Sequence, residues 1–167
     1  AAALRLAGHA VRTPLLWNPV LDERVGGRVL LKPECLQRTG SFKFRGAFNR
    51  LARMSPPVRE RGVVACSSGN HAQGLAEAAR FFGVPATIVM PSDAPAVKRA
   101  RTERSGARVV PYDRAREDRD AIAEAIAAET GATFVHPFED RDVIAGQGTV
   151  GLEIAADCRA LGATPDA

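Results

Sequence analysis

The sequence predicts an α/β fold in which an open parallel sheet carries helices on both faces. Short apolar runs rich in β-branched residues alternate with stretches of helical periodicity over residues 63–135. The runs begin about 20 to 26 residues apart, which is the size of a strand–helix–strand unit with short loops. Strands that are apolar on both sides are typical of parallel sheets, so we expect a buried sheet with right-handed connections.

Four strands are expected in this array, over residues 63–66, 86–90, 107–110 and 133–135. The helix after the first strand has an apolar stripe at positions i, i+3, i+4 and i+7, made of Leu75, Ala78, Ala79 and Phe82. Two more helices are expected, over 96–105 and around the stripe Ile122, Ala125, Ile126 and Glu129. Glycine follows each of these helices, as is common at helix C-termini.

The flanks of the array have a different pattern. A strand is expected over 29–31, and Ser41 fits the N-cap of a helix with the apolar face Phe44, Ala47, Phe48 and Leu51. A last helical stripe contains Val150, Ile154, Cys158 and Leu161. The flanks therefore contain elements that do not continue the strand–helix array.

The composition is that of an ordinary folded protein. The chain has 167 residues, 46% hydrophobic and 25% charged, which excludes a disordered chain. It contains no apolar run long enough for a membrane span. The net charge of +4 is spread without like-charge runs or interleaved aromatic residues, so no nucleic-acid partner is expected. Lysine occurs only at Lys32, Lys43 and Lys98, which makes each one worth inspecting.

The three cysteines are Cys35, Cys66 and Cys158. Their odd number and wide spacing match neither a disulfide framework nor a metal-ligand set, so no metal is expected. Each has apolar neighbours in the sequence, and we expect buried free thiols in a reducing cytoplasm.

Lys43 is the first candidate for chemistry. It lies between Phe42 and Phe44 at the start of an expected helix, close to Arg45. Apolar surroundings and a nearby positive charge disfavour the ammonium form, and a lysine that forms Schiff bases needs the neutral amine. The alternative is a surface lysine whose stem lies on apolar neighbours.

A second candidate segment, 67–74, reads Ser-Ser-Gly-Asn-His-Ala-Gln-Gly. It follows an expected buried strand and opens a helix, where free backbone N–H groups and the helix dipole favour an anion. The spacing matches neither the dinucleotide-binding glycine fingerprint nor the P-loop. The alternative is an ordinary capped helix start.

A third segment, 136–149, also follows an expected strand and could face the same cleft. Glu139 and Asp140 could form a carboxylate pair, but we expect them to be exposed loop acids.

Five segments together resemble the threonine/serine dehydratase and serine racemase group of fold-type II pyridoxal-phosphate enzymes, a tryptophan synthase β-like family. They are 31–34 with Gln37, 39–47, 67–74, 94–98, and 136–138 with 143–149. They occur in the family's order and cover nearly the whole chain. The resemblance implies that residues 1–50 and 148–167 belong to an incomplete larger α/β domain, and that residues 51–147 form a smaller α/β domain. Phe44-Arg45-Gly46 after the lysine resembles this branch rather than the cysteine and threonine synthases, which typically have an acidic residue directly after the lysine.

The resemblance implies roles for seven residues. Lys43 would form the Schiff base with pyridoxal phosphate and move the α-proton, with Phe42 beside the cofactor ring and Asn70 on its phenolic oxygen. The substrate carboxylate would be held by Ser67, Ser68, Gly69, Asn70 and His71. In racemases of this group the serine matching Ser68 is the acid/base on the opposite face.

The resemblance also implies a function in amino-acid metabolism. A dehydratase (ammonia-lyase) would convert threonine, serine or 3-hydroxyaspartate into a 2-oxo acid and ammonia, as a cytoplasmic homo-oligomer. Serine racemisation or another β-elimination is the alternative. Family members are about twice as long, and the glycine-rich loop that holds the cofactor phosphate has no match in this sequence. A non-catalytic fragment that binds small molecules therefore stays open.

Overall fold

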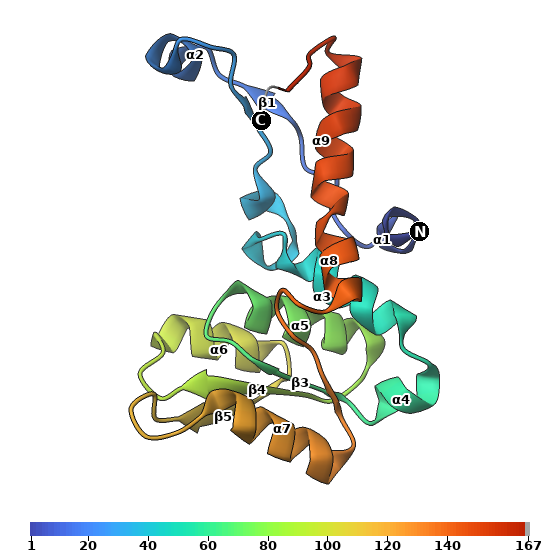
Figure 1. The fold of residues 1–167 in the computed structure, drawn as a ribbon, viewed down its shortest axis with the longest axis vertical. Helices are drawn as coiled ribbons and strands as arrows, with labels where there is room; N and C mark the ends of the chain where they lie inside the picture. The colour runs from blue at the N-terminus through green and yellow to red at the C-terminus, as the bar shows by residue number, and fades with distance from the viewer. Residues whose placement is uncertain (166–167) are drawn as a thin grey trace.

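The computed structural model describes residues 1–165, and a four-stranded parallel sheet lies in its lower part as drawn in Figure 1. Its strands are β3 (Val63–Cys66), β4 (Ala86–Pro91), β5 (Arg108–Tyr112) and β6 (Thr133–Phe134), in the order β5-β4-β3-β6. Val63 pairs with Ala86 on one side and with Thr133 on the other, so β3 is an inner strand of the sheet. The parallel α/β architecture predicted from the sequence is confirmed.

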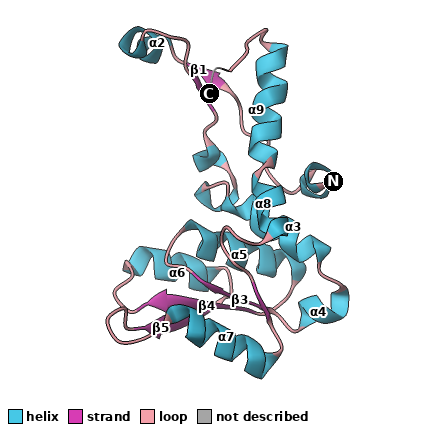
Figure 2. Cartoon of the chain, viewed as in Figure 1, coloured by secondary structure: helices cyan, strands magenta, loops and turns pink. Residues whose placement is uncertain are grey.

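Helices cover both faces of this sheet, as Figure 2 shows. On one face lie α5 (Asn70–Phe82) and α6 (Ala96–Arg104), and on the other lies α7 (Arg119–Thr130). Strand β3 alternates between the two cores: Val63 and Ala65 pack toward α5, whereas Val64 and Cys66 pack with Ala123 of α7. The burial of both faces is why the strand sequence is apolar throughout.

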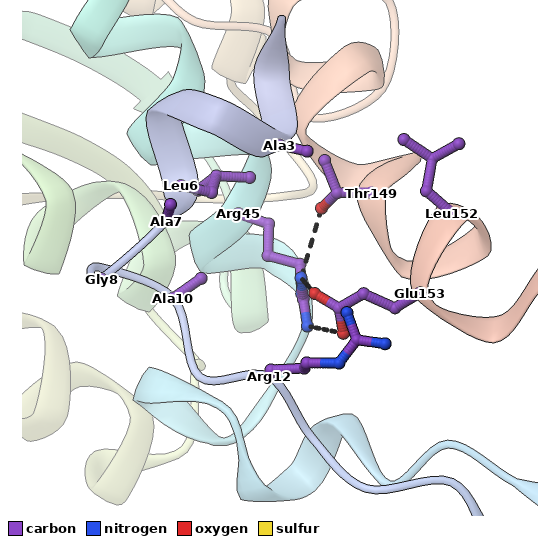
Figure 3. A pocket seen from close by; sticks show the side chains of 10 residues that line it. All are labelled: Ala3, Leu6, Ala7, Gly8, Ala10, Arg12, Arg45, Thr149, Leu152 and Glu153. Carbon is purple, nitrogen blue, oxygen red and sulfur yellow. Dashed lines mark hydrogen bonds and ion pairs between the residues drawn. The ribbon is translucent and has the colours of Figure 1, made fainter. Parts of the chain in front are cut away.

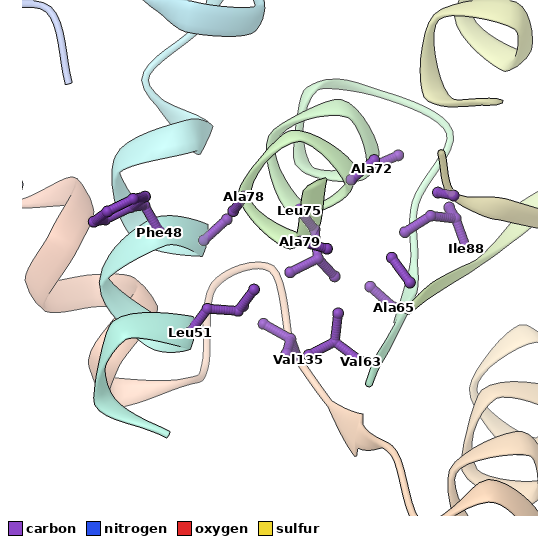
Figure 4. Close-up of a cluster of buried hydrophobic side chains, with 14 of the residues drawn as sticks. Phe48, Leu51, Val63, Ala65, Ala72, Leu75, Ala78, Ala79, Ile88 and Val135 are labelled. Carbon is purple, nitrogen blue, oxygen red and sulfur yellow. The ribbon is translucent and has the colours of Figure 1, made fainter. Parts of the chain in front are cut away.

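The larger core lies between the sheet, α5 and α3 (Lys43–Arg53) (Figure 4). All four residues of the predicted apolar face of α3 are buried: Phe44, Ala47, Phe48 and Leu51. Burial of each of the three large side chains, Phe44, Phe48 and Leu51, stabilises the fold by about 1.5–3 kcal/mol. This packing fixes α3, and with it Lys43, relative to the carboxyl ends of the strands.

The predicted N-cap of α3 is wrong. Phe42 occupies the N-cap position, and the buried hydroxyl of Ser41 has no hydrogen-bond partner among the described residues. The short 3₁₀ turn η2 (Arg38–Gly40) precedes it, with Thr39 at φ 64° and Gly40 at φ 75°. This left-handed pair turns the chain so that Ser41 is extended and lies one residue before the cap.

Most of the remaining elements lie on the side of α3 away from the sheet, whereas α4 lies beside the sheet (Figure 1). These remaining elements are α1 (Ala2–Leu6), β1 (Leu16–Trp17), α2 (Pro19–Val25), β2 (Leu30–Leu31), η1 (Glu34–Leu36), α4 (Pro56–Glu60), α8 (Arg141–Gln147) and α9 (Thr149–Ala160). Strands β1 and β2 form a separate antiparallel pair. The predicted stripe of the last helix lies on α9 except Leu161, which follows the helix and is half-exposed.

The cysteines only partly follow the expectation. Cys66 and Cys158 are buried, and burial raises the pKa of the Cys66 thiol to about 12. The prediction of burial is wrong for Cys35, which is exposed because it lies in the surface turn η1. All three are free thiols.

The expected division of the chain stays a prediction. The boundary at 50/51 falls inside α3, so this helix would belong to both parts, and the boundary at 147/148 falls between α8 and α9. Residues 166–167 of the last part lie outside the described residues. Within residues 1–165, no helix is long and apolar enough to cross a membrane.

Candidate active site

Lys43 is the first residue of α3, and its side chain reaches the loop that follows β6. Its Nζ donates a hydrogen bond to the carbonyl oxygen of Pro137 at 3.1 Å and lies 3.5 Å from Oε1 of Gln147. The Phe42 ring lies beside it, with its centroid 5.0 Å from Nζ. Burial lowers the pKa of the Lys43 ammonium group, in the direction the sequence predicts.

Arg45 does not contribute to that shift in the way expected, because its guanidinium group turns away from Lys43. It is 1% exposed and forms a bidentate pair with Glu34, with two N–O distances of 2.8 Å. It also binds Glu153 of α9 at 2.6 Å and the hydroxyl of Thr149 at 3.3 Å (Figure 3). Arg45 therefore joins η1, α3 and α9 on the far side of α3 from the lysine amine.

Two glycines allow neighbouring helices to approach α3 at its start. A Cβ atom at Gly74 of α5 would lie 2.9 Å from the carbonyl carbon of Lys43. A Cβ atom at Gly46 of α3 would lie 2.8 Å from Cγ of Gln147 on α8. The first turn of α3 is thus enclosed between α5 and α8 at backbone contact distance.

The segment after β3 forms the start of α5, as the sequence predicts. Ser67, Ser68 and Gly69 are half-buried, and Asn70 is the exposed first residue of the helix. The N-cap residue is Gly69, so no side chain caps the helix. Its first backbone N–H groups therefore have no helical partner, and together with the helix dipole they form a site suited to a carboxylate.

His71 differs from these residues because its ring is buried. It is 3% exposed, and its Nε2 lies 3.2 Å from the carbonyl oxygen of Val135, to which it donates as the neutral ring. Burial lowers its pKa to about 4, and the positive charge of Lys43 adds to this. Nδ1 is buried without a partner among residues 1–165. Because the ring is buried in the fold, the backbone N–H of His71 is the group that would contact the substrate carboxylate expected from the sequence.

The loop after β6 brings the third predicted segment beside Lys43. Glu139 is exposed, as expected. The expectation is wrong for Asp140, which caps α8 by accepting hydrogen bonds from Asp142 N at 2.8 Å and Val143 N at 3.1 Å. It also pairs with Arg50 at 2.7 Å. Its place immediately before a short helix explains this role, because a carboxylate satisfies free N–H groups there.

Sequence reasoning missed three contributors to this site. Pro137 acts through its carbonyl oxygen, Gln147 through its amide, and Gly74 through the absence of a side chain. All three lie in segments that carry the family resemblance, but no residue pattern indicates their contact with Lys43. The site combines a partly buried primary amine, an aromatic ring and an anion-binding helix start, which suits a carbonyl compound and a carboxylate.

Comparison with known proteins agrees with this chemistry. Residues 6–167 match the family described as "Pyridoxal-phosphate dependent enzyme". An L-threo-3-hydroxyaspartate ammonia-lyase from Pseudomonas sp is 55% identical over 92% of this chain and 48% of its own length. An L-threonine ammonia-lyase from Thermotoga maritima is 54% identical over 87% of this chain and 36% of its own length. The chain spans about half the length, or less, of the curated relatives it matches.

Solved structures show the same relationship. A threonine deaminase from T.th. superposes with a TM-score of 0.90 at 46% identity, covering 98% of this chain and 52% of the other. Maize serine racemase superposes with a TM-score of 0.91 at 38% identity, covering 95% of this chain and 48% of the other.

Proposed function

Because the chain belongs to the family of pyridoxal-phosphate dependent enzymes, we propose that it carries the lysine-bearing part of an ammonia-lyase site for small β-hydroxy amino acids. The observation that carries the proposal is the partly buried amine of Lys43, which extends from a first turn of α3 whose backbone packs against Gly74 in the uncapped helix α5. The residues present fit the cofactor's aldehyde and ring. The amine has a lowered pKa, and Phe42, 38% exposed, offers a ring face beside it.

The chain's own residues would have three tasks. Lys43 would bind the cofactor and take the proton from the substrate's Cα, and a lowered pKa favours the neutral amine that both tasks need. The N–H groups at the start of α5, with Ser67 and Asn70, would hold the substrate carboxylate and so fix Cα near that amine. When bound, pyridoxal phosphate supplies the electron sink for the electron pair left at Cα.

The overall reaction balances without an oxidant. The Cα–H and Cβ–O bonds break and water leaves, which gives an enamine. The enamine becomes an imine, and addition of water then releases ammonia and the 2-oxo acid. The two curated relatives support this substrate class, because threonine and threo-3-hydroxyaspartate both carry a β-hydroxyl group.

Serine racemisation is a second candidate, and Ser68 favours it. Ser68 lies in the half-buried loop between β3 and α5, and its hydroxyl could serve as the acid/base on the second face of the substrate. The similarity to maize serine racemase supports this candidate.

The test uses the protein expressed from its complete gene and loaded with pyridoxal phosphate. We expect ammonia and a 2-oxo acid from at least one of L-threonine, L-serine and L-threo-3-hydroxyaspartate. Lys43→Ala should abolish turnover, whereas Lys98→Ala, at an exposed lysine, should leave it unchanged. Ammonia release from none of the three substrates, or undiminished turnover by Lys43→Ala, would overturn the proposal. For the second candidate, Ser68→Ala should abolish D-serine formation and leave ammonia release in place.

We further propose a cytoplasmic location and a homo-oligomeric state. Free thiols at Cys35, Cys66 and Cys158 support a reducing compartment. Exposed apolar side chains on the part of the chain away from the sheet support self-association, among them Leu4, Trp17, Val25 and Leu152.

A further inference from the structure

Gln147 is the last residue of α8, and its side-chain amide lies between two groups of the candidate site. Its Nε2 donates to the carbonyl oxygen of Pro137 at 3.4 Å, and its Oε1 lies 3.5 Å from Nζ of Lys43. Lys43 donates to the same Pro137 oxygen at 3.1 Å. The amine, the amide and the carbonyl therefore form a closed triangle.

The chemistry of the partners fixes the orientation of the Gln147 amide. A lysine ammonium group can only donate, so it must face the amide oxygen. A proline carbonyl can only accept, so it must face the amide nitrogen. The reverse orientation would place donor against donor and acceptor against acceptor.

Close packing holds this side chain in place. Gln147 lies over the α-carbon of Gly46, where a Cβ atom would be 2.8 Å from its Cγ and 2.9 Å from its Nε2. Gly46 is three residues after Lys43 and so lies on the same face of α3. The amide therefore has little freedom to leave the amine.

We propose that Gln147 is a positioning residue that, together with the carbonyl group of Pro137, holds the Lys43 amine in place for reaction. This inference rests on the proposed function, in which Lys43 is the reactive amine. The Gln147 amide oxygen accepts one hydrogen bond from the amine and the Pro137 carbonyl oxygen accepts another, so the direction of the amine is set before any ligand binds. A neutral amide does this without the full negative charge that would keep the amine protonated.

The test measures the reactivity of Lys43 in the full chain without cofactor. The chain is labelled with a limiting amount of an acylating reagent from pH 6 to 11, and each lysine is quantified by mass spectrometry. Exposed Lys98 reports reagent reactivity, and buried Lys32, paired with Glu153 at 2.8 Å, reports that the chain is folded. Among the titratable groups on the packed elements, His71 on α5 interacts electrostatically with Lys43, and His71 interacts in turn with His136 and Asp140 before α8.

Two variants of Gln147 separate charge from shape. Gln147→Glu places a carboxylate at the amine. The midpoint of the Lys43 profile, which is its labelling plotted against pH, should rise by about one to three pH units. Labelling of Lys43 at pH 8 should therefore fall at least tenfold. Gln147→Met keeps the length but removes the acceptor, so the midpoint should fall. Ala145→Glu puts the same charge on an exposed position of α8 and should leave the profile unchanged.

An unchanged Lys43 profile in both Gln147 variants, with Lys32 still protected, would overturn the proposal. This outcome is independent of the proposed function, because the labelling uses no cofactor and no substrate. A chain that fails to bind pyridoxal phosphate could still show the Gln147 effect, and the reverse also holds.

Discussion

Gly74 of α5 lies against the backbone of Lys43, so close that a Cβ atom at Gly74 would stand 2.9 Å from the lysine carbonyl carbon and 3.0 Å from the nitrogen of Phe44. Both neighbours are backbone atoms, which cannot move without shifting the start of α3. The position of the candidate amine therefore depends on the absence of a side chain on a different helix.

The first prediction follows from that contact. Gly74→Ala should destabilise the chain by about 1–3 kcal/mol through overpacking, although alanine favours helices. It should also displace Lys43 and lower its reaction with pyridoxal phosphate. Urea unfolding measures the first effect and borohydride trapping the second.

Gly151→Ala is the matched control, because Gly151 is an exposed glycine within α9 and a Cβ atom there would have no neighbouring atom within 4 Å. It should stabilise the chain by up to about 1 kcal/mol. Equal stability changes in the two variants would contradict the role of the Gly74 contact.

The second prediction concerns the buried Arg45. Arg45→Met should lower the free energy of unfolding by about 3–5 kcal/mol, because it leaves Glu34 without a cation and Glu153 with Lys32 alone. At lower pH the free energy of unfolding of Arg45→Met should come closer to that of wild type, because protonation removes the charge of a buried carboxylate that has lost its cation. Arg116→Met, at a side chain 85% exposed, should change stability by less than about 0.5 kcal/mol. A loss of stability in Arg45→Met that is no larger than in Arg116→Met would refute the structural role of the Arg45 ion pairs.

The third prediction uses the pKa of His71, which burial lowers to about 4 from its ordinary value of 6.5. Between these two pH values the unfolded chain binds a proton that the folded chain does not, so stability falls as pH decreases from 6.5 to 4. The loss from this group is about 3 kcal/mol over that window. His71→Gln keeps a donor for Val135 without a titrating ring, so its stability should depend less on pH.

Urea unfolding of both proteins at pH 6.5 and pH 4.5 measures this difference. Parallel stability changes in wild type and His71→Gln would mean that His71 is not the group responsible. The predicted fall in stability with decreasing pH also requires that the His71 ring is neutral at pH 7 and donates its hydrogen bond to the carbonyl oxygen of Val135.

The parallel sheet could be predicted from the sequence because both faces are buried. Val63 and Ala65 face α5 while Val64 and Cys66 face α7, which produces an unbroken apolar run that is easy to recognise. The apolar face of α3 was equally clear, because Phe44, Phe48 and Leu51 repeat at helical spacing.

The sequence predicts the short strands β2 and β6, but several other short elements were missed because their signals are local and weak. Helix α2 has an Asn18 cap, Pro19 at its first turn and Gly26 after its end, but it has no buried residue and so no apolar stripe. Asp140 looked like a loop acid because its capping role requires a helix start that periodicity over seven residues does not reveal.

The candidate site was predictable in its residue types but not in its contacts. Lys43 and the start of α5 stand out because each follows a recognisable pattern at an element end. The carbonyl of Pro137 and the amide of Gln147 meet Lys43 across 94 and 104 residues of sequence, and the pairing of Arg45 with Glu153 spans 108. Contacts at such separation depend on packing of whole elements, which a single sequence does not specify.

The central claim, that Lys43 is the amine that bonds to pyridoxal phosphate, is tested most directly by reductive trapping. The full chain is incubated with the cofactor, reduced with borohydride and mapped by mass spectrometry over Lys32, Lys43, Lys98 and the N-terminal amine. We predict saturable labelling that is concentrated at Lys43 and is lost in Lys43→Ala, with only background at exposed Lys98. Labelling of Lys98 or the N-terminus that equals or exceeds labelling of Lys43 would contradict the account.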